Sequence, residues 1–406
     1  MRKWTTFCAA AITAGLLSSA AYADTVIRIA YPGWDSADQE KAVTELFDTY
    51  EQQNPGVTIE LISIPFPVMK QQLVVALRSG DAPDMGYIDG RWIPEMQAAG
   101  FLADLTGRVA DLDRADWYEG PWTASTVDGK VYGIPDRIDP WMVYYNTDLF
   151  ETAGVAEFPK TMSELVDSGK KLTKDGVYGW GLIGANDATL IGRYLNFLYA
   201  FGGSFLNEDG TKAVVNDEAG VKALKFYTDL LNEHAIAQPS AVGNSHGDVR
   251  QLFMTNQVAM FIDGPWARGT LNEMAPNVKW SVGQIPAEDG KEPRFTTTSW
   301  YYTVFEPSEN KDEVWKFVQY LTETDNMTKG VVTLPARKSA AETARFQAEE
   351  FKPWIAALPY GEPFPVTDQF SQIAEIMGNA IQEVLSKNKT AQQAADDAAV
   401  AIDAIL

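Results

Sequence analysis

The sequence predicts an α/β protein of two lobes, on three observations. Its 406 residues exceed the length of one ordinary domain. Strand and helix patterns alternate over the first hundred residues, and the alternation begins again after residue 143. No long flexible linker separates the halves, so short segments should join them. Two such lobes leave a cleft at the carboxyl ends of their strands, where ligands tend to bind.

The N-terminus, residues 1–23, is expected to be a secretory signal peptide. Arg2 and Lys3 precede the apolar stretch 7–17, and the small-x-small sequence AYA then offers a cleavage site. A membrane anchor is the alternative, but the stretch is shorter than the roughly 20 residues that span a bilayer. Cleavage would remove the only cysteine, Cys8, and take the formal charge from −22 to −24. This acidic balance disfavours nucleic acid and anionic lipid as partners.

The first lobe begins with the strand VIRIA (26–30). Ser36 and Gln39 then form a capping box for a helix whose apolar residues recur at helical spacing, and VTIELI (57–62) is a second strand. Strand, helix and strand in this order require a right-handed crossover in a parallel sheet. A helix over 68–78, a strand over 85–88 and a helix over 93–99 repeat the unit.

The second lobe starts with a strand near Val143, and QVAMFI (257–262) is a later strand. The helical spacing of apolar residues predicts helices at 162–172, 190–201 and 221–231. Two further helices at 312–322 and 368–385, followed by an Ala-rich segment over 391–405, close the chain. Each lobe is therefore expected to be a β-sheet flanked by helices.

Trp, Asp and Arg recur in five stretches that follow predicted strands. An aromatic face packs on the apolar face of a sugar ring, while carboxylates and guanidinium groups exchange pairs of hydrogen bonds with vicinal hydroxyls. The alternative is structural: these Trp side chains could fill the core between the lobes, and the charged residues could simply pair. The stretches are YPGWD (31–35), DGRW (89–92), DRIDPW (136–141), GPWAR (264–268) and TTSWYY (297–302).

NQVAMFIDGPWARGTL (256–271) resembles a signature of the periplasmic solute-binding proteins of ABC transporters, in the carbohydrate-binding group that includes maltose-binding protein. Further matching stretches, in the right order, cover nearly the whole mature chain. They are APDMGYIDGRWIPEMQAAGFLADLT (82–106), GKVYGIPDRIDPWMVYYNTDLF (129–150), LPAR (334–337) and PFPVTDQFSQIAEIMGNAIQEVL (363–385).

The resemblance implies a ligand-binding role for particular residues. Trp266 would stack on the sugar, Asp139 would lie beside the first crossing, and the loops after the first and third strands would supply further contacts. The stretch 184–193 lacks an aromatic that some relatives carry, which leaves open how many sugar units the second lobe can bind. The full set is Tyr31, Trp34, Asp35, Asp89, Arg91, Trp92, Arg137, Asp139, Trp141, Arg193, Trp266, Trp300, Tyr301 and Arg337.

The same resemblance implies a two-lobe periplasmic binding protein-like fold of type II, with crossings near 137–141, 299–303 and 333–336. It divides the chain into an N-lobe, 24–137 plus 302–333, and a C-lobe, 138–301 plus 334–406. It also implies a periplasmic monomer that closes on a mono- or oligosaccharide and delivers it to a membrane permease, without catalysis, cofactor or membrane insertion.

Two other functions stay open. A ligand that is an anionic sugar or polyol derivative, whether phosphorylated, sulfonated or uronic, would use Arg91, Arg137, Arg193 or Arg337 bidentately. A secreted carbohydrate-active enzyme would need two acids across one bond, for which Asp136 and Asp139 are the candidates.

Metal and cofactor sites are not expected. With only His234 and His246 as histidines, a transition-metal site would depend on carboxylates. The sequence contains no phosphate loop, dinucleotide fingerprint or nucleophile elbow.

Overall fold

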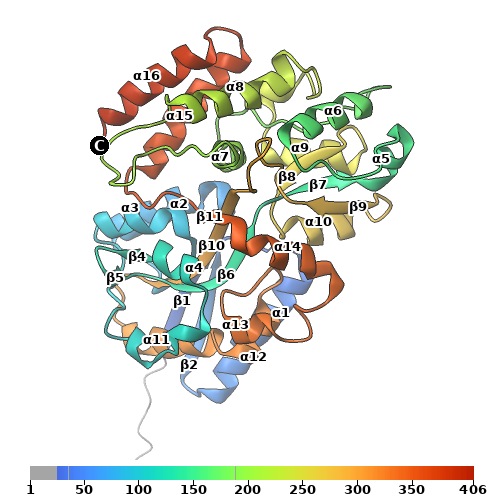
Figure 1. Ribbon diagram of the computed structural model, residues 1–406. Helices are drawn as coiled ribbons and strands as arrows, with labels where there is room; N and C mark the ends of the chain where they lie inside the picture. Colours follow the sequence, from blue (N-terminus) through green and yellow to red (C-terminus); the bar gives the residue numbers. More distant parts are fainter. Residues whose placement is uncertain (1–24, 35, 188) are drawn as a thin grey trace, which may run out of the picture.

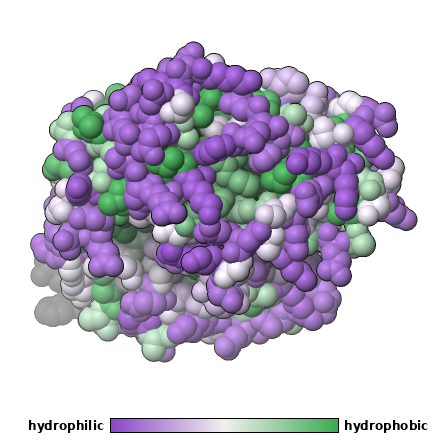
Figure 2. Space-filling model, turned by 45° about the horizontal axis from the view of Figure 1, so that its top comes forward, coloured by the Kyte–Doolittle hydropathy of each residue, from purple (hydrophilic) through white to green (hydrophobic). Residues whose placement is uncertain are grey.

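The computed structural model describes residues 25–34, 36–187 and 189–406, arranged as two lobes, each with its own sheet (Figure 1). The expected signal peptide, residues 1–23, lies outside the described residues. Within the described chain, no helix combines the length and the apolar character needed to cross a membrane. Figure 2 shows a face on which hydrophilic residues dominate and hydrophobic ones are scattered.

The first lobe contains a six-stranded sheet in the order β11-β10-β3-β1-β2, with β6 paired to β10. β1 runs parallel to both β2 and β3, as predicted, and β10 is antiparallel to β3 and β6. Parallel neighbours bring the carboxyl ends of β1 and β3 to one edge of the sheet. The strands are β1 Thr25–Tyr31, β2 Val57–Ser63, β3 Met85–Asp89, β6 Ile134–Pro140, β10 Phe295–Val304 and β11 Gly361–Pro363, beside a small hairpin of β4 Thr126–Val127 and β5 Lys130–Val131.

In the first lobe, α1, α2, α3 and α11 lie where the sequence predicted helices, whereas α4, α12 and α13 were not predicted. Ser36 caps α1 by accepting a hydrogen bond from the backbone N–H of Gln39 (3.2 Å), and the helix buries Val43, Leu46 and Phe47. The cap thus fixes where α1 begins, next to the end of β1. The helices are α1 Ala37–Gln53, α2 Phe66–Ser79, α3 Ile93–Ala98, α4 Glu119–Ala124, α11 Lys311–Leu321, α12 Thr324–Gly330 and α13 Lys338–Ala341.

The second lobe has a three-stranded antiparallel sheet, β8-β7-β9, formed by Met260–Asp263, Met142–Asn146 and Trp280–Gly283. The predicted strand 257–262 begins later, at Met260, and the backbones of Gln257 and Ala259 form hydrogen bonds with Tyr178. α7 is buried along its whole length and is the central helix of this lobe. The helices are α5 Thr147–Ala153, α6 Met162–Leu172, α7 Leu190–Ala200, α8 Glu218–Asn232, α9 His246–Met254, α10 Ala267–Met274, α14 Lys352–Ala357, α15 Phe370–Leu385 and α16 Ala391–Asp403.

Three chain segments lie side by side where the lobes meet. β6 of the large sheet continues into β7 of the small one through Trp141 and pairs with β10 on one side. On the other side the backbone N–H of Ile138 donates to Leu334 O (2.9 Å). The stretches 136–141 and 297–302 therefore lie largely within strands rather than after them, contrary to the prediction, because these strands pair with each other between the lobes.

Candidate functional site

A cavity of about 260 Å³ lies between the lobes and is lined from both sides. The first lobe contributes the end of β1, the end of β3 and the start of α2, while the second contributes the starts of α7, α9 and α10. The lining residues are Tyr31, Pro32, Gly33, Trp34, Gln39, Phe66, Tyr87, Asp89, Arg91, Arg137, Trp141, Thr189, Arg193, His246, Arg250, Trp266, Thr298 and Trp300.

The first-lobe wall is a stack of aromatic rings. Tyr31 stacks on Tyr87 with ring centres 4.7 Å apart and 13° between the planes, and Tyr87 stacks on Trp300 at 5.2 Å. Trp34 tilts against Tyr31 at 4.6 Å. The three strand residues come from β1, β3 and β10, which are neighbours in the sheet, so their pairing places the rings in a row. Tyr31, Tyr87 and Trp300 are largely buried in this row, and Trp34 is its partly exposed member at the cavity.

Trp266 stands on the second-lobe wall, at the start of α10. Its ring meets the ring of Trp141 edge to face, at 5.5 Å and 81°, and the Trp141 indole N–H donates to Thr298 Oγ1 (3.2 Å). A Cβ added to Gly264 would lie 2.0 Å from the Trp266 ring, so only glycine lets the ring lie here. The Gly-Pro break therefore places a partly exposed indole at the cavity instead of in the core.

Charged residues of the first lobe and the crossing strand occur as pairs. Arg91 donates two hydrogen bonds to Asp89, from Nε to Oδ1 at 2.9 Å and from Nη2 to Oδ2 at 2.6 Å. Arg137 Nε lies 3.0 Å from Asp139 Oδ2, and its guanidinium lies over the ring of Trp300. Each guanidinium is held in place before any ligand arrives.

Asp136 lies behind this wall and accepts a hydrogen bond from the Tyr87 hydroxyl (2.8 Å). Burial raises the pKa of its carboxyl to about 6, against the opposing effects of Tyr87 and Arg137. The side chain does not line the cavity.

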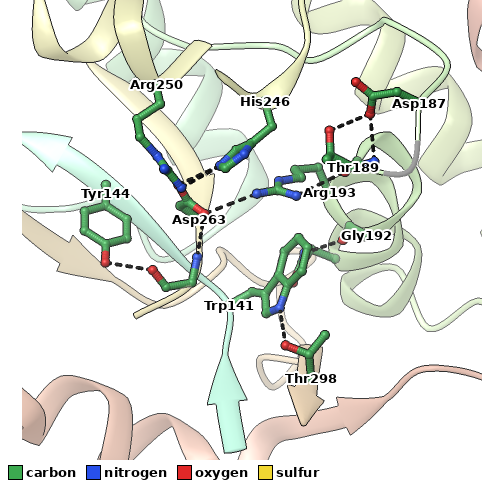
Figure 3. A network of polar contacts seen from close by, with 12 residues as sticks. Trp141, Tyr144, Asp187, Thr189, Gly192, Arg193, His246, Arg250, Asp263 and Thr298 are labelled. Atoms are coloured by element: carbon green, nitrogen blue, oxygen red, sulfur yellow. Dashed lines mark hydrogen bonds and ion pairs between the residues drawn. The ribbon is translucent and has the colours of Figure 1, made fainter. Parts of the chain in front are cut away.

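On the second-lobe wall, three basic side chains surround the carboxylate of Asp263 (Figure 3). Arg193 Nη2 lies 3.1 Å from Oδ1, while His246 Nε2 and Arg250 Nη2 lie 2.8 and 2.7 Å from Oδ2. Burial alone would raise the pKa of Asp263, but Arg250, His246 and Arg193 hold it well below the usual range. Burial, with Arg193 next, lowers the pKa of His246 to about 4, so the imidazole is neutral at pH 7.

Nine residues proposed from the sequence line this cavity, and their role as ligand-binding residues stays a prediction. They are Tyr31, Trp34, Asp89, Arg91, Arg137, Trp141, Arg193, Trp266 and Trp300.

Four other described residues of that set do not line it. Trp92 packs behind the wall against Phe66 and Trp300, and Asp139 is fully buried beside Arg137. The Tyr301 hydroxyl donates to Pro121 O (2.8 Å) on the opposite face of β10 from Trp300. Successive side chains of a strand point to opposite faces, so Trp300 and Tyr301 cannot both reach one cavity.

Arg337 lies outside the cavity lining, where it pairs with Asp116 and donates to Thr322 O (2.8 Å). Asp35 lies outside the described residues.

Several lining residues, notably His246 and Arg250, were not predicted from the sequence. A local signal for them exists: Ser245 and Asp248 form a capping box that begins α9, and a helix starting there places His246 and Arg250 on one face. Among the described residues no group of three His, Cys, Asp or Glu side chains could hold a metal ion.

This chain is similar to proteins of a known family. The family model of bacterial extracellular solute-binding proteins matches residues 33–328. A relative in Brucella abortus (strain 2308) is 30% identical over 100% of this chain and 99% of its own length, and its name proposes binding without naming a ligand. The lactose-binding protein of Rhizobium radiobacter is 27% identical over 78% of this chain and 75% of its own.

A solved structure shows the same architecture. An ABC transporter solute-binding protein from Thermotoga lettingae, bound with α-D-tagatose, is 28% identical and superposes with a TM-score of 0.85. The match covers 94% of this chain and 99% of that one.

Proposed function

The chain belongs to the bacterial extracellular solute-binding proteins, and on that premise we propose that it is the sugar receptor of an ABC importer. It binds a mono- or oligosaccharide in the cavity between the lobes and delivers it to the transmembrane permease. The relatives named for lactose and solved with α-D-tagatose support a saccharide as the ligand.

One observation carries the proposal: flat aromatic rings and pre-oriented charged pairs face the same cavity from both lobes. Trp34 of the first lobe and Trp266 of the second are partly exposed at the cavity and offer rings for the apolar side of a pyranose, while Asp89 and Arg91 offer an acceptor and a donor for neighbouring hydroxyls. The cavity volume of about 260 Å³ lies just below the roughly 300–1,000 Å³ of small-molecule sites. This size favours one or two sugar units over a long chain.

The number and the pairing of the carboxylates at the cavity disfavour a hydrolytic function. Asp89 is the only carboxylate among the described lining residues, and Arg91 holds both of its oxygens. Asp139 is tied to Arg137, and Asp136 lies behind Tyr87. A glycosidase needs two carboxyl groups facing one bond. The arrangement therefore supports a binding protein rather than a secreted carbohydrate-active enzyme.

We also propose that residues 1–23 are a cleaved signal peptide and that the receptor is a periplasmic monomer. Its N-lobe comprises 24–137 plus 302–333, and its C-lobe comprises 138–301 plus 334–406. One contact bears on the last boundary: the Ser339 backbone N–H donates to Asp116 of the first lobe (2.9 Å). This bond supports a return of the chain to the second lobe after α13 rather than at residue 334.

A thermal-shift screen against neutral monosaccharides, disaccharides and acidic sugars tests the proposal. A ligand present at 100 times its dissociation constant adds about 2.7 kcal/mol to the free energy of unfolding. We expect at least one saccharide to raise the melting temperature, while amino acids and short peptides at the same concentration leave it unchanged. A shift produced only by non-sugar solutes would refute the sugar assignment.

A further inference from the structure

The Asp263 cluster has more donors than its one acceptor can use. Asp263 Oδ1 accepts from Arg193 and from the backbone N–H of Gly264 (2.9 Å), while Oδ2 accepts from Arg250 Nε (3.0 Å) and Nη2 and contacts His246. The carboxylate is saturated. A guanidinium carries five N–H donors.

Donors remain on both guanidinium groups. Within the described part of the chain, Arg193 Nε is buried without a hydrogen-bond partner, and no bond is formed by Arg250 Nη1. Arg193, Arg250 and His246 all line the cavity. The unused Arg250 donor belongs to a wall that a ligand would contact, whereas the Arg193 Nε donor is closed to solvent.

The cluster carries one net positive charge at neutral pH, because two guanidinium groups face one carboxylate. Burial lowers the pKa of Arg193 to about 10, against the opposing effect of Asp263, so the group stays protonated. Its side chain is only 6% exposed. A buried charge without a full counter-charge is costly, and structural support of Asp263 alone would need one guanidinium rather than two.

Three helix N-termini add to this positive wall. α9 begins with His246 itself, α7 begins directly after Thr189 and α10 directly after Trp266, and all three residues line the cavity. Each N-terminus carries a partial positive charge from the helix dipole.

On the first-lobe wall, which faces this cluster, the basic side chains are paired with carboxylates. Arg91 and Arg137 each have a carboxylate of their own, and Asp136 lies behind Tyr87. Among the described lining residues, the positive charge without a carboxylate partner therefore lies in the second lobe.

We propose that the ligand is a sugar bearing an anionic group, a carboxylate, phosphate or sulfonate, and that Arg193, Arg250 and His246 bind this group. The inference rests on the sugar receptor function proposed above. The anion supplies the missing counter-charge beside both guanidinium groups and accepts the unused N–H donor of Arg250, while the aromatic rings and the Asp89–Arg91 pair contact the rest of the sugar.

Isothermal titration calorimetry on the mature protein tests this with matched pairs of probes: galactose and galacturonate, glucose and glucose 6-phosphate, and glucose and its 6-deoxy-6-sulfonate. We expect at least one anionic member to bind at least tenfold more tightly than its neutral counterpart. Raising NaCl from about 50 to about 500 mM should weaken that binding several-fold, because added salt screens charge pairs. The three pairs distinguish the three kinds of anion.

Variants of Arg250 test whether the anionic group of the ligand binds at the Asp263 cluster. Arg250→Gln should weaken binding of the anionic probe at least tenfold and Arg250→Lys less, because lysine keeps the charge but loses the fork. Arg114→Gln, which removes a surface arginine paired with Glu119, is the control and should bind as wild type. Thermal unfolding of each variant without ligand verifies the fold.

Two outcomes overturn the inference. If a neutral sugar binds as tightly as its anionic counterpart and Arg250→Gln has no effect, the anion subsite is wrong while the sugar receptor function stands. If no saccharide of either kind binds, the proposed function fails and the inference fails with it.

Discussion

Replacing Trp266 by alanine should weaken sugar binding about thirtyfold without unfolding the protein. An aromatic side chain buries 150–250 Å² in all, so one ring face against a sugar covers roughly 50 Å² and contributes about 1.3 kcal/mol at 25 cal/mol per Å². Directional packing of the ring adds roughly 0.5–1 kcal/mol. The total of about 2 kcal/mol corresponds to a factor of about thirty in the dissociation constant.

Calorimetry with the sugar identified by the thermal-shift screen measures this loss. Trp280→Ala is a matched control, because Trp280 is a partly buried indole of the same lobe that does not line the cavity. The control should lose stability and keep its affinity. A Trp266→Ala protein that binds within threefold of wild type would show that the ring contributes nothing to the site, and the stacking argument would be refuted.

Three further predictions concern the same site. Gly264→Ala should lower ligand affinity by displacing the Trp266 ring, which a Cβ would approach to 2.0 Å, and unchanged calorimetric affinity would count against this positioning role. Because the pKa of His246 is depressed to about 4 in the fold, its neutral form stabilises the protein above pH 6.5, and this contribution, on the order of 3 kcal/mol, is lost as pH falls from 6.5 to 4. The stability difference between wild type and His246→Gln in urea denaturation should therefore narrow from pH 7.5 to 4.5, and a constant difference would contradict the buried neutral imidazole. Small-angle X-ray scattering should show a smaller radius of gyration with the bound sugar than without it, whereas equal values would argue against closure of the lobes.

The elements that depend on local patterns could be predicted from the sequence. The cap at Ser36 gives the start of α1, the helical periodicity after it gives the buried face of the helix, and the apolar runs give β1, β2 and β3. Trp266 was also predictable, because the Gly-Pro break ends a strand and sends the next residue to the lobe surface.

Contacts between distant segments could not be predicted in this way. Arg337 pairs with Asp116, which lies 221 residues earlier in the chain, so its absence from the cavity lining is a matter of tertiary packing. Tyr87 joins the aromatic wall only because β3 lies between β1 and β10, an order that no local pattern contains. The position of Arg250 at the cavity depends both on where α9 begins and on the contact of Arg250 with Asp263, which belongs to another element.

A crystal structure of the protein with its bound sugar tests the central claim most directly. We predict electron density for one sugar between the lobes, with a ring face on Trp266 and polar contacts to both Arg91 of the first lobe and Arg250 of the second. A sugar bound to one lobe alone, or outside the cavity between Trp266 and Trp300, would contradict the account.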